Sequence, residues 1–296
     1  MRVIVKPTDG LGNQLFQYAA GRYYAKKYNA SLLIAARCLA ENGSPHPRPL
    51  LLHEFAIKAP IRTLNIADRL LSSPKQIISR LREPICGAIR SKVVQEDFSR
   101  LFYYQHVDVP QGTRLLYLNG YFQNYSIVRA VEAELRNEFA LRKPLSGKNL
   151  EMADRITSQE VPVSVHFRRG DYLTELDKRG IPSYAYYENA FELIRRQFRK
   201  PFFFLFSDDP VFANSWATDR ANCVAVNHNG QSAGHEDLRL MSLCKHHVIA
   251  NSTFSWWGAW LNPRTDKQVI APSRWLLKCE TASIEIIPRE WLILES

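Results

Sequence analysis

Two adjacent arginines at the end of an apolar run are the residues of this chain best suited to chemistry. Val161–Val165 is rich in β-branched residues and predicts a buried strand, and His166, Arg168, Arg169 and Asp171 follow it closely. A guanidinium matches phosphate oxygens because its planar fork donates two parallel hydrogen bonds and keeps its charge. In open α/β sheets, ligands bind at the carboxyl ends of strands. The pattern indicates a diphosphate site, with a surface basic turn paired to Asp171 as the alternative.

A second candidate lies between the first expected strand and the first expected helix. Gly10 and Gly12 permit a tight turn and a close approach of the backbone to a ligand, and Asn13 is placed to cap the helix. The third glycine of a dinucleotide-binding fingerprint is missing, because Leu15 stands in its place. A turn with a cap and a ligand-facing role for Asn13 and Gln14 both remain open.

Two adjacent acids follow the apolar run Pro201–Phe206. Asp208 and Asp209 would bind a divalent metal at such a strand end, but no histidine ligand accompanies them. Asp209 followed by Pro210 is typical of a helix start, with the acid as cap and the proline in the first turn. Asp208 is then left as a hydrogen-bond acceptor for a guanine edge or for ribose hydroxyls.

The stretch Asn251–Leu261 combines hydroxyl groups with three tryptophans. Hydroxyls and unpaired amides at a helix N-terminus favour an anion, so Ser252, Thr253 and Ser255 are candidate phosphate ligands. The tryptophans recur at helical spacing, which favours packing in the core over stacking on a base or sugar. They are Trp256, Trp257 and Trp260.

Another acidic pair precedes the helix predicted over residues 237–244. Asp237 is the expected cap of that helix, and Glu236 is a candidate general base comparable to Asp171. His246 and His247 precede a buried strand, and we expect structural roles for both.

Composition limits the class of protein. A chain of 296 residues with 46% hydrophobic residues is long enough for two cores, and we expect domains at 1–150 and 151–296. The net charge is +10, but the basic residues are scattered and no nucleic-acid-binding motif accompanies them. They are densest over residues 62–92, where interleaved leucine and isoleucine predict an amphipathic helix. That helix packs inward in the favoured interpretation, and rests on an anionic membrane surface in the alternative.

The cysteines and the lack of a long apolar stretch indicate the cellular compartment. Its five cysteines are odd in number, scattered and without a Cys-x-x-Cys pair, which favours reduced thiols in the cytoplasm and argues against a zinc site. No stretch offers the ~18 to 20 apolar residues of a membrane span.

Strands and helices are expected to alternate, which is typical of a mostly parallel α/β sheet. The predicted strands are 3–5, 31–35, 115–118, 163–165, 201–206, 247–250 and 269–271. The predicted helices are 13–29, 126–139, 184–199, 237–244 and 254–261. Two Rossmann-like halves facing a central cleft are the simplest architecture.

Taken in order, these stretches resemble a known family. His166–Asp171 matches the H-x-R-R-x-D motif shared by α1,2-, α1,6- and protein O-fucosyltransferases. Glycosyltransferase family 11, the galactoside α1,2-fucosyltransferases, is the best match, and the resemblance runs from about residue 3 to about residue 293. The supporting blocks are Gly10–Ala19, Gly120–Gln123, Phe206–Asp209, Glu236–Lys245 and Asn251–Asn262.

The resemblance implies a GT-B-like fold, with an acceptor-side domain at 1–150 and a GDP-fucose-binding domain at 151–296. It implies inverting transfer of L-fucose from GDP-β-L-fucose to O2 of a terminal galactose in an oligosaccharide or glycolipid, without a metal or other cofactor. An α1,6 or protein O-fucose linkage on the same fold is the alternative. The family context implies a bacterial cytoplasmic enzyme of O-antigen biosynthesis, with peripheral contact to the inner membrane.

The resemblance also implies roles for individual residues. His166, Arg168 and Arg169 would bind the pyrophosphate, and Asp171 would orient an arginine or contact the nucleotide. The other implied donor-binding residues are Gly12, Asp208, Ser252, Thr253, Phe254 and Ser255. Asn13 would face the reacting sugar, so Asn13, Arg168 and Asp171 are the expected catalytic residues.

One position departs from the family pattern. Members often have Gly-Gly before Leu-Gly-Asn, whereas Thr8-Asp9-Gly10 stands here. Asp9 thereby adds a carboxylate and joins Asp171 and Glu236 as a candidate general base.

Overall fold

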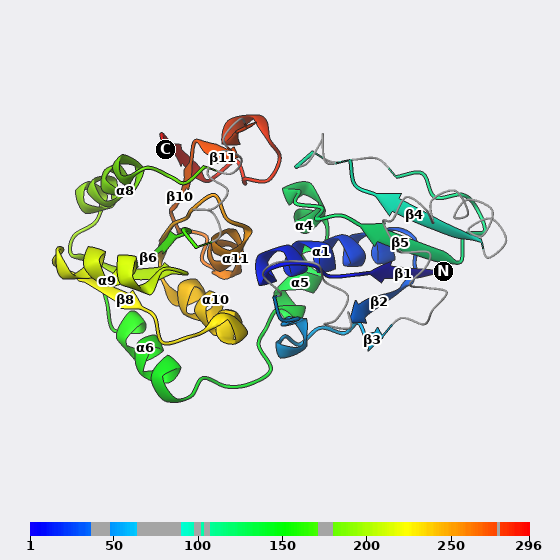
Figure 1. Cartoon of the computed structure of the whole chain (residues 1–296), viewed down its shortest axis with the longest axis horizontal. Helices are drawn as coiled ribbons and strands as arrows, with labels where there is room; N and C mark the ends of the chain where they lie inside the picture. The colour runs from blue at the N-terminus through cyan, green and yellow to red at the C-terminus, as the bar shows by residue number, and fades with distance from the viewer. Residues whose placement is uncertain (37–47, 64–89, 98–101, 104–106, 171–179, 277–278) are drawn as a thin grey trace. The chain divides into compact units, whose positions relative to one another are not determined.

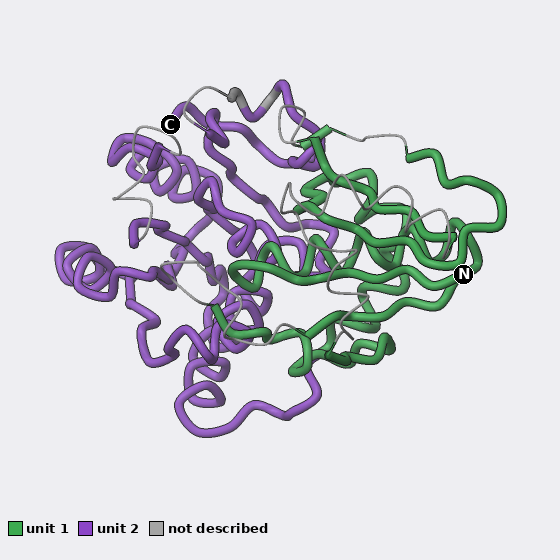
Figure 2. The backbone as a smooth tube through the Cα atoms, turned by 45° about the vertical axis from the view of Figure 1, so that its right-hand side comes forward, with its two compact units in different colours: residues 1–140 green, residues 141–296 purple. Residues whose placement is uncertain are grey.

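The computed structural model describes residues 1–36, 48–63, 90–97, 102–103, 107–170, 180–276 and 279–296. These form two compact units, Met1–Ala140 and Leu141–Ser296, which Figure 2 distinguishes by colour. The boundary between them precedes the expected one at residue 150, and the predicted acceptor and donor roles of the two parts stay predictions. Asp171 and most of the basic segment 62–92 lie outside the described residues.

Unit 1 is built on a parallel sheet of five strands in the order β3-β2-β1-β5-β4 (Figure 1). The strands are β1 (Arg2–Val5), β2 (Ser31–Ala36), β3 (Ile61–Thr63), β4 (Ser91–Gln95) and β5 (Leu115–Asn119). The helices are α1 (Leu11–Lys27), the one-turn η2 (Leu52–Glu54), α4 (Tyr125–Ala130) and α5 (Glu132–Glu138). The single helix expected over 126–139 is wrong, because the backbone leaves the helical region at Val131.

Helix α1 packs directly on the sheet. A Cβ at Gly21 would lie 2.6 Å from Cγ2 of Val5, so glycine allows the close approach of the helix to β1. The helix begins at Leu11 after Gly10, whose extended backbone makes it the N-cap residue. The prediction of Asn13 as cap is therefore wrong, since Asn13 already lies within the first turn.

Unit 2 contains a parallel sheet of six strands in the order β13-β10-β9-β6-β7-β8. The strands are β6 (Val161–Phe167), β7 (Pro201–Ser207), β8 (Cys223–Val226), β9 (His246–Val248), β10 (Val269–Pro272) and β13 (Leu292–Leu294). The helices are α6 (Gly147–Thr157), α8 (Tyr184–Gln197), α9 (Pro210–Thr218), α10 (Gly234–Leu243) and α11 (Thr253–Leu261). Short turns η5 (Gln231–Ala233) and η6 (Thr281–Ser283) and the antiparallel pair β11 (Arg274–Leu276) and β12 (Cys279–Glu280) complete it.

Strand order in unit 2 is that of a Rossmann sheet. The chain runs outward from β6 through β7 to β8, then returns to the other side of β6 and continues through β9, β10 and β13. Neighbouring strands β6 and β9 are thus left by connections that run in opposite directions, and open α/β sheets bind ligands at the carboxyl ends of such a strand pair. Two parallel sheets flanked by helices confirm the predicted α/β class.

Strand β6 is buried along its whole length. Val161, Val163, Val165 and Phe167 pack in one cluster with α8 and α9. Alternation of side chains along a strand turns His166 toward the opposite face, where α10 and α11 lie (Figure 1).

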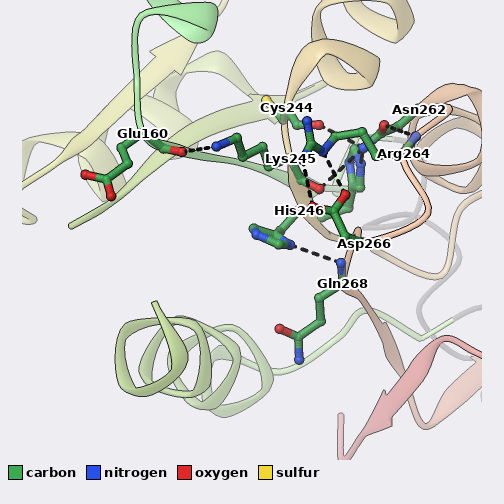
Figure 3. Close-up of polar contacts among 9 residues, drawn as sticks. Glu160, Cys244, Lys245, His246, Asn262, Arg264, Asp266 and Gln268 are labelled. Carbon is green, nitrogen blue, oxygen red and sulfur yellow. Dashed lines mark hydrogen bonds and ion pairs between the residues drawn. The ribbon is translucent and has the colours of Figure 1, made fainter. Parts of the chain in front are cut away.

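The two adjacent histidines at β9 are structural, as predicted. His247 is fully buried, with its Nδ1 2.7 Å from Oγ of Ser164 and its Nε2 2.8 Å from Nδ2 of Asn262. Nδ1 of His246 accepts a hydrogen bond from the backbone N–H of Gln268 at 3.0 Å (Figure 3). Burial holds the pKa of His247 well below its ordinary value, so this ring is neutral and bridges β6 to the end of α11.

Two further sequence expectations concern thiols and membranes. Cys223 and Cys244 are free thiols, and burial raises the pKa of Cys223 to about 11. Across the helices that the structure describes, none is both long enough and apolar enough to span a bilayer.

Candidate functional site

His166 presents a neutral, buried imidazole at the end of β6. The residue is 4% exposed, its ring lies 5.6 Å from that of Phe254, and its backbone carbonyl accepts a hydrogen bond from the Tyr187 hydroxyl. Burial lowers its pKa to about 4, with the Arg168 charge acting in the same direction and Asp208 opposing them. Its Nδ1 has no hydrogen-bond partner among the residues that the structure describes. A buried ring nitrogen without a partner is costly unless a ligand provides one.

Arg168 is oriented by a carboxylate from the neighbouring strand. Its Nη1 lies 2.7 Å from Oδ2 of Asp208, and the other carboxylate oxygen accepts the backbone N–H of Arg169 at 2.9 Å. Gly170 is required beside this pair, because a Cβ there would lie 2.5 Å from Oδ2 of Asp208. One carboxylate therefore holds both the guanidinium and the turn that carries it.

Arg169 points to different partners. Its Nε lies 3.2 Å from Oδ2 of Asp209, and its guanidinium stacks 3.9 Å from the ring centroid of Phe212. Asp209 also accepts the backbone N–H of Phe212 at 3.1 Å and caps α9, with Pro210 in the first turn. The cap predicted at Asp209 is thus confirmed, and the two arginines are held apart by two different acids.

The N-terminus of α11 supplies hydroxyls and aligned amides. Ser252 caps the helix by accepting the backbone N–H of Phe254 at 3.3 Å, while Thr253 and Phe254 are half-buried. The Ser255 hydroxyl is buried and donates to the backbone carbonyls of Ala250 and Ser252. A helix N-terminus of this kind favours a negatively charged ligand.

The tryptophans of α11 belong to the core, as expected. Trp256, Trp257 and Trp260 are at most 3% exposed. A Cβ at Gly258 would lie 2.6 Å from Sδ of Met241, which shows how closely α11 packs on α10. This packing fixes the helix whose first turn lies beside His166.

These groups gather at one edge of the unit 2 sheet. His166 lies near the carboxyl end of β6 and Arg168 follows that strand, Asp208 follows β7, and Ser252–Phe254 follow β9. All three strands end at the same edge, and the opening between β6 and β9 is the switch point of the sheet. The structure thus brings together most donor-site residues predicted from the sequence, whereas Asp171 lies outside the described residues.

The acidic pair at α10 differs from its prediction. The helix begins at Gly234 after Ala233, so Asp237 lies within it and the predicted cap is wrong. Asp237 accepts a hydrogen bond from Nδ2 of Asn229 at 2.8 Å. Glu236 lies 3.4 Å from Nε of Arg239, which places it in an ion pair within the helix.

Asp237 makes the free energy of unfolding of the chain depend on pH. Burial raises its pKa to about 7, Glu236 adds to the rise, and the Asn229 amide opposes it. Because the folded chain holds this proton up to higher pH than the unfolded chain, its contribution to stability is complete below pH ~4 and is lost as pH rises through 7. Asp237→Asn removes the titration. We expect the wild type to lose on the order of 2 kcal/mol relative to this variant between pH 5 and pH 8, measured by denaturant unfolding.

The matched control for this experiment is Asp154→Asn, which changes an exposed aspartate of α6. It should leave the pH dependence of the wild type in place. Parallel stability curves for the wild type and Asp237→Asn would contradict the prediction.

Unit 1 places the remaining predicted residues around the start of α1. Asn13 accepts a hydrogen bond from Nε2 of Gln123 at 2.9 Å, and Gly12 is buried in the first helical turn. Gln14 donates to the backbone carbonyls of Asp9 and Pro49. Gln14 therefore supports the loop, whereas Asn13 is oriented by a residue that follows β5.

Sequence reasoning assigned no role to the residues after β5. Gln123 orients Asn13, and the Tyr121 hydroxyl donates to Oδ2 of Asp9 at 2.7 Å. The signal was present, because Gly120–Gln123 directly follows an apolar strand and carries polar side chains at its carboxyl end. What the sequence did not contain is the pairing of this loop with the loop after β1.

Comparison with known proteins gives a consistent result. The sequence model of glycosyl transferase family 11 matches residues 96–294, which is more than half of the chain. The chain is 28% identical to an α-1,2-colitosyltransferase of Escherichia coli, over 99% of both proteins. It is also 28% identical to the Escherichia coli O-antigen biosynthesis glycosyltransferase WbnK, over 90% of this chain and 93% of WbnK. A galactoside α-(1,2)-fucosyltransferase 1 of Sus scrofa is 26% identical over 53% of this chain and 45% of its own length.

Solved structures support the fold. The NodZ α-1,6-fucosyltransferase soaked with GDP-fucose matches with a TM-score of 0.53 at 16% identity, over 88% of this chain and 92% of NodZ. A second NodZ structure, from Bradyrhizobium, gives a TM-score of 0.54 at 14% identity, over 88% and 93% of the two chains. This likeness confirms the GT-B-like fold class predicted from the sequence.

Proposed function

The chain belongs to glycosyl transferase family 11, and on this basis we propose that it transfers L-fucose from GDP-β-L-fucose to O2 of a terminal galactose. The transfer inverts the anomeric carbon and gives an α1,2 linkage. The acceptor is an oligosaccharide or glycolipid of the kind assembled in O-antigen biosynthesis, in keeping with the function named for WbnK. We assign the reaction to the cytoplasm, at the inner membrane face.

One observation carries the donor assignment. The Arg168 guanidinium is held by Asp208 at 2.7 Å, next to a buried and neutral His166, at the switch point of the unit 2 sheet. A fixed cation beside an imidazole nitrogen that lacks a partner matches a diphosphate, whose oxygens accept from both groups. The NodZ α-1,6-fucosyltransferase, which has a similar fold, was crystallised and soaked with GDP-fucose, in keeping with this assignment.

The proposed donor site includes the start of α11. Ser252 and Thr253 face the diphosphate with the helix N-terminus, and Phe254 packs against His166. Arg169 completes the positive field from its place over Phe212. Asp208 acts as the positioning group for Arg168, because both of its oxygens already accept hydrogen bonds from the arginine turn.

The proposed reaction is a single displacement. Galactose O2 attacks C1 of fucose as the bond from C1 to the phosphate oxygen breaks, and GDP leaves with that electron pair. Arg168 stabilises the charge developing on the β-phosphate, so the step needs neither a metal nor a covalent intermediate. The hydroxyl proton passes to a carboxylate or to the leaving phosphate, and the candidate carboxylates are Asp171, Glu236 and Asp9. Asn13 is the residue of unit 1 that we assign to the reacting sugar.

A second donor is favoured by one specific observation. The relative that aligns over 99% of both chains is named an α-1,2-colitosyltransferase. Colitose is L-fucose without the 3-hydroxyl, so the same site chemistry would handle GDP-colitose. Offering the chain both donors in competition decides which sugar is preferred.

The test of the proposed function is transfer from GDP-fucose to lactose, with and without EDTA, followed by NMR of the product. We expect an α1,2-fucosylated galactose, formed at the same rate in the presence of the chelator. Transfer with a different linkage would overturn the O2 assignment. Absence of both GDP binding and transfer would overturn the proposed function, and a rate that falls with EDTA would overturn the metal-free mechanism.

A further inference from the structure

An aspartate in the loop after β1 has a backbone conformation that glycine would adopt at lower cost. Asp9 has a φ of 61°, in the left-handed region, which aspartate adopts more often than most residues with a Cβ and which glycine adopts freely. Gly10 next to it is extended, with a φ of −70°. The loop therefore carries a carboxylate at the one position of its turn where glycine would relieve strain. Strain of this kind is concentrated at functional sites.

A single hydrogen bond orients this exposed carboxylate. The Tyr121 hydroxyl donates to Oδ2 of Asp9 at 2.7 Å, and Oδ1 has no partner among the described residues. The tyrosine comes from the loop after β5, which is the neighbour of β1 in the sheet. One oxygen of Asp9 is thus fixed in place and the other is directed to solvent.

The loop that carries Tyr121 is itself held by a buried acid. Glu96 is 5% exposed and follows β4, and its carboxylate accepts the backbone N–H groups of Tyr121 at 2.6 Å and Phe122 at 2.9 Å. A Cβ at Gly120 would lie 2.3 Å from Cβ of Glu96, so the loop passes directly over the acid. Phe122 has a φ of 52°, which shows that the loop is held in a strained conformation. Tyr121 is therefore positioned before any ligand arrives.

The same loop orients a second polar side chain. Gln123 donates to Oδ1 of Asn13 at 2.9 Å, in the first turn of α1. Asp9 and Asn13 thus project from one loop and helix start, and each is held by the loop after β5. These groups lie at the carboxyl ends of the neighbouring strands β1 and β5, the edge at which open α/β sheets bind ligands.

The chemistry of this edge suits a sugar and disfavours a phosphate. A carboxylate repels phosphate and accepts hydrogen bonds from hydroxyls, and a charge-assisted bond of that kind is stronger than a neutral one. We propose that Asp9 is a specificity-determining residue for the glycan acceptor, binding an acceptor hydroxyl through Oδ1, and that Tyr121 is its positioning residue. The proposal rests on the proposed function, since it assumes that the acceptor is a galactoside.

The test is a double-mutant cycle of Asp9→Gly and Tyr121→Phe with lactose as acceptor. Asp9→Gly should raise the acceptor KM about tenfold or more, because a charge-assisted hydrogen bond is lost while the turn is relieved of strain. The KM for GDP-fucose should not change, and the loss should lie in the acceptor KM rather than in kcat. Tyr121→Phe should raise the acceptor KM by about threefold to tenfold in the wild-type background and have no further effect beside Asp9→Gly.

Two controls separate binding from folding. Asp108→Asn removes an exposed acid that precedes the amino end of β5, and should leave the acceptor KM at its wild-type value. Asp9→Asn keeps an oxygen acceptor and tolerates the same φ, so it should recover part of the loss seen for glycine. A fall in kcat with an unchanged acceptor KM would overturn the binding role in favour of a base.

The outcomes for the two proposals are distinct. A wild-type chain that transfers fucose, together with an Asp9→Gly variant of unchanged acceptor KM, overturns the role of Asp9 and leaves the proposed function standing. Galactoside binding measured by calorimetry, weakened by Asp9→Gly in a chain that transfers no fucose, supports Asp9 and overturns the donor assignment. A chain that neither binds nor modifies a galactoside overturns both.

Discussion

Replacing Arg168 with alanine is expected to lower kcat for the proposed fucosyl transfer on the order of a hundredfold or more, with the fold intact. Nη1 of Arg168 already lies 2.7 Å from Oδ2 of Asp208, which orients the guanidinium. The side chain therefore does not have to reorient when the leaving phosphate of the proposed reaction gains charge. A preorganised donor aimed at developing charge typically contributes ~3 to 4 kcal/mol, which corresponds to that factor. The measurement is steady-state transfer to lactose under saturating GDP-fucose.

Arg168→Lys distinguishes charge from geometry. Lysine keeps a positive charge but loses the planar fork. We therefore expect kcat of Arg168→Lys to stay at least about tenfold below that of the wild type. The matched control is Arg196→Ala, an arginine of α8 that is 78% exposed and pairs with Glu192 at 3.0 Å in the same helix. Such a surface pair contributes little, and this variant should keep full activity. Near-full activity in Arg168→Ala would contradict the role of the guanidinium in the transition state.

The second large effect is expected from Asp208→Asn, because this carboxylate organises the arginine turn. One of its oxygens binds Arg168 and the other accepts the backbone N–H of Arg169 at 2.9 Å. An asparagine amide keeps one acceptor but turns an NH2 group toward a second donor. The loss of a hydrogen bond to a charged partner amounts to about 1.5 to 3 kcal/mol, so kcat/KM should fall roughly tenfold to a hundredfold.

Asp209→Asn is the control for this prediction, since it changes the next acid in the chain. Asparagine caps a helix as well as aspartate does, so α9 should stay intact. The substitution removes the negative charge that faces Arg169, whose Nε lies 3.2 Å from Oδ2 of Asp209, and leaves Arg168 paired with Asp208. The activity of Asp209→Asn should fall far less than that of Asp208→Asn. Equal losses would show that general negative charge, and not the hold on Arg168, explains the effect.

Much of the fold followed from local patterns. The apolar runs that form β6 and β7 do not show the 3.6-residue spacing of an amphipathic helix, so a strand was the expected structure. Asp209 followed by Pro210 marked the start of α9. The tryptophans of α11 recur at helical spacing and are buried as expected. These signals work because side-chain period and cap chemistry are properties of a few consecutive residues.

Short edge strands and the start of α10 were missed for a physical reason. β3 and β8 have three and four residues, too few for a period to stand out, and β4 begins at Ser91, at the very end of the segment 62–92 interpreted as an amphipathic helix. The start of α10 at Gly234 has no usual cap, and a Cβ there would lie 3.4 Å from Phe254. The turn η5 (Gln231–Ala233) leads directly into this helix, and local cap chemistry therefore misplaced its start at Asp237.

For the site itself, the sequence determined which residue types stand at the ends of the strands, and only the tertiary structure decided their partners. Arg169 and Asp208 are 39 positions apart, and Asp9 and Tyr121 are 112 apart. Each pair meets because β6 lies beside β7 and β1 lies beside β5. Strand order depends on the packing of the whole sheet, and it cannot be inferred from the spacing of apolar residues within one segment. The same packing removes water from His166 and so makes its imidazole neutral, which composition and spacing alone do not reveal.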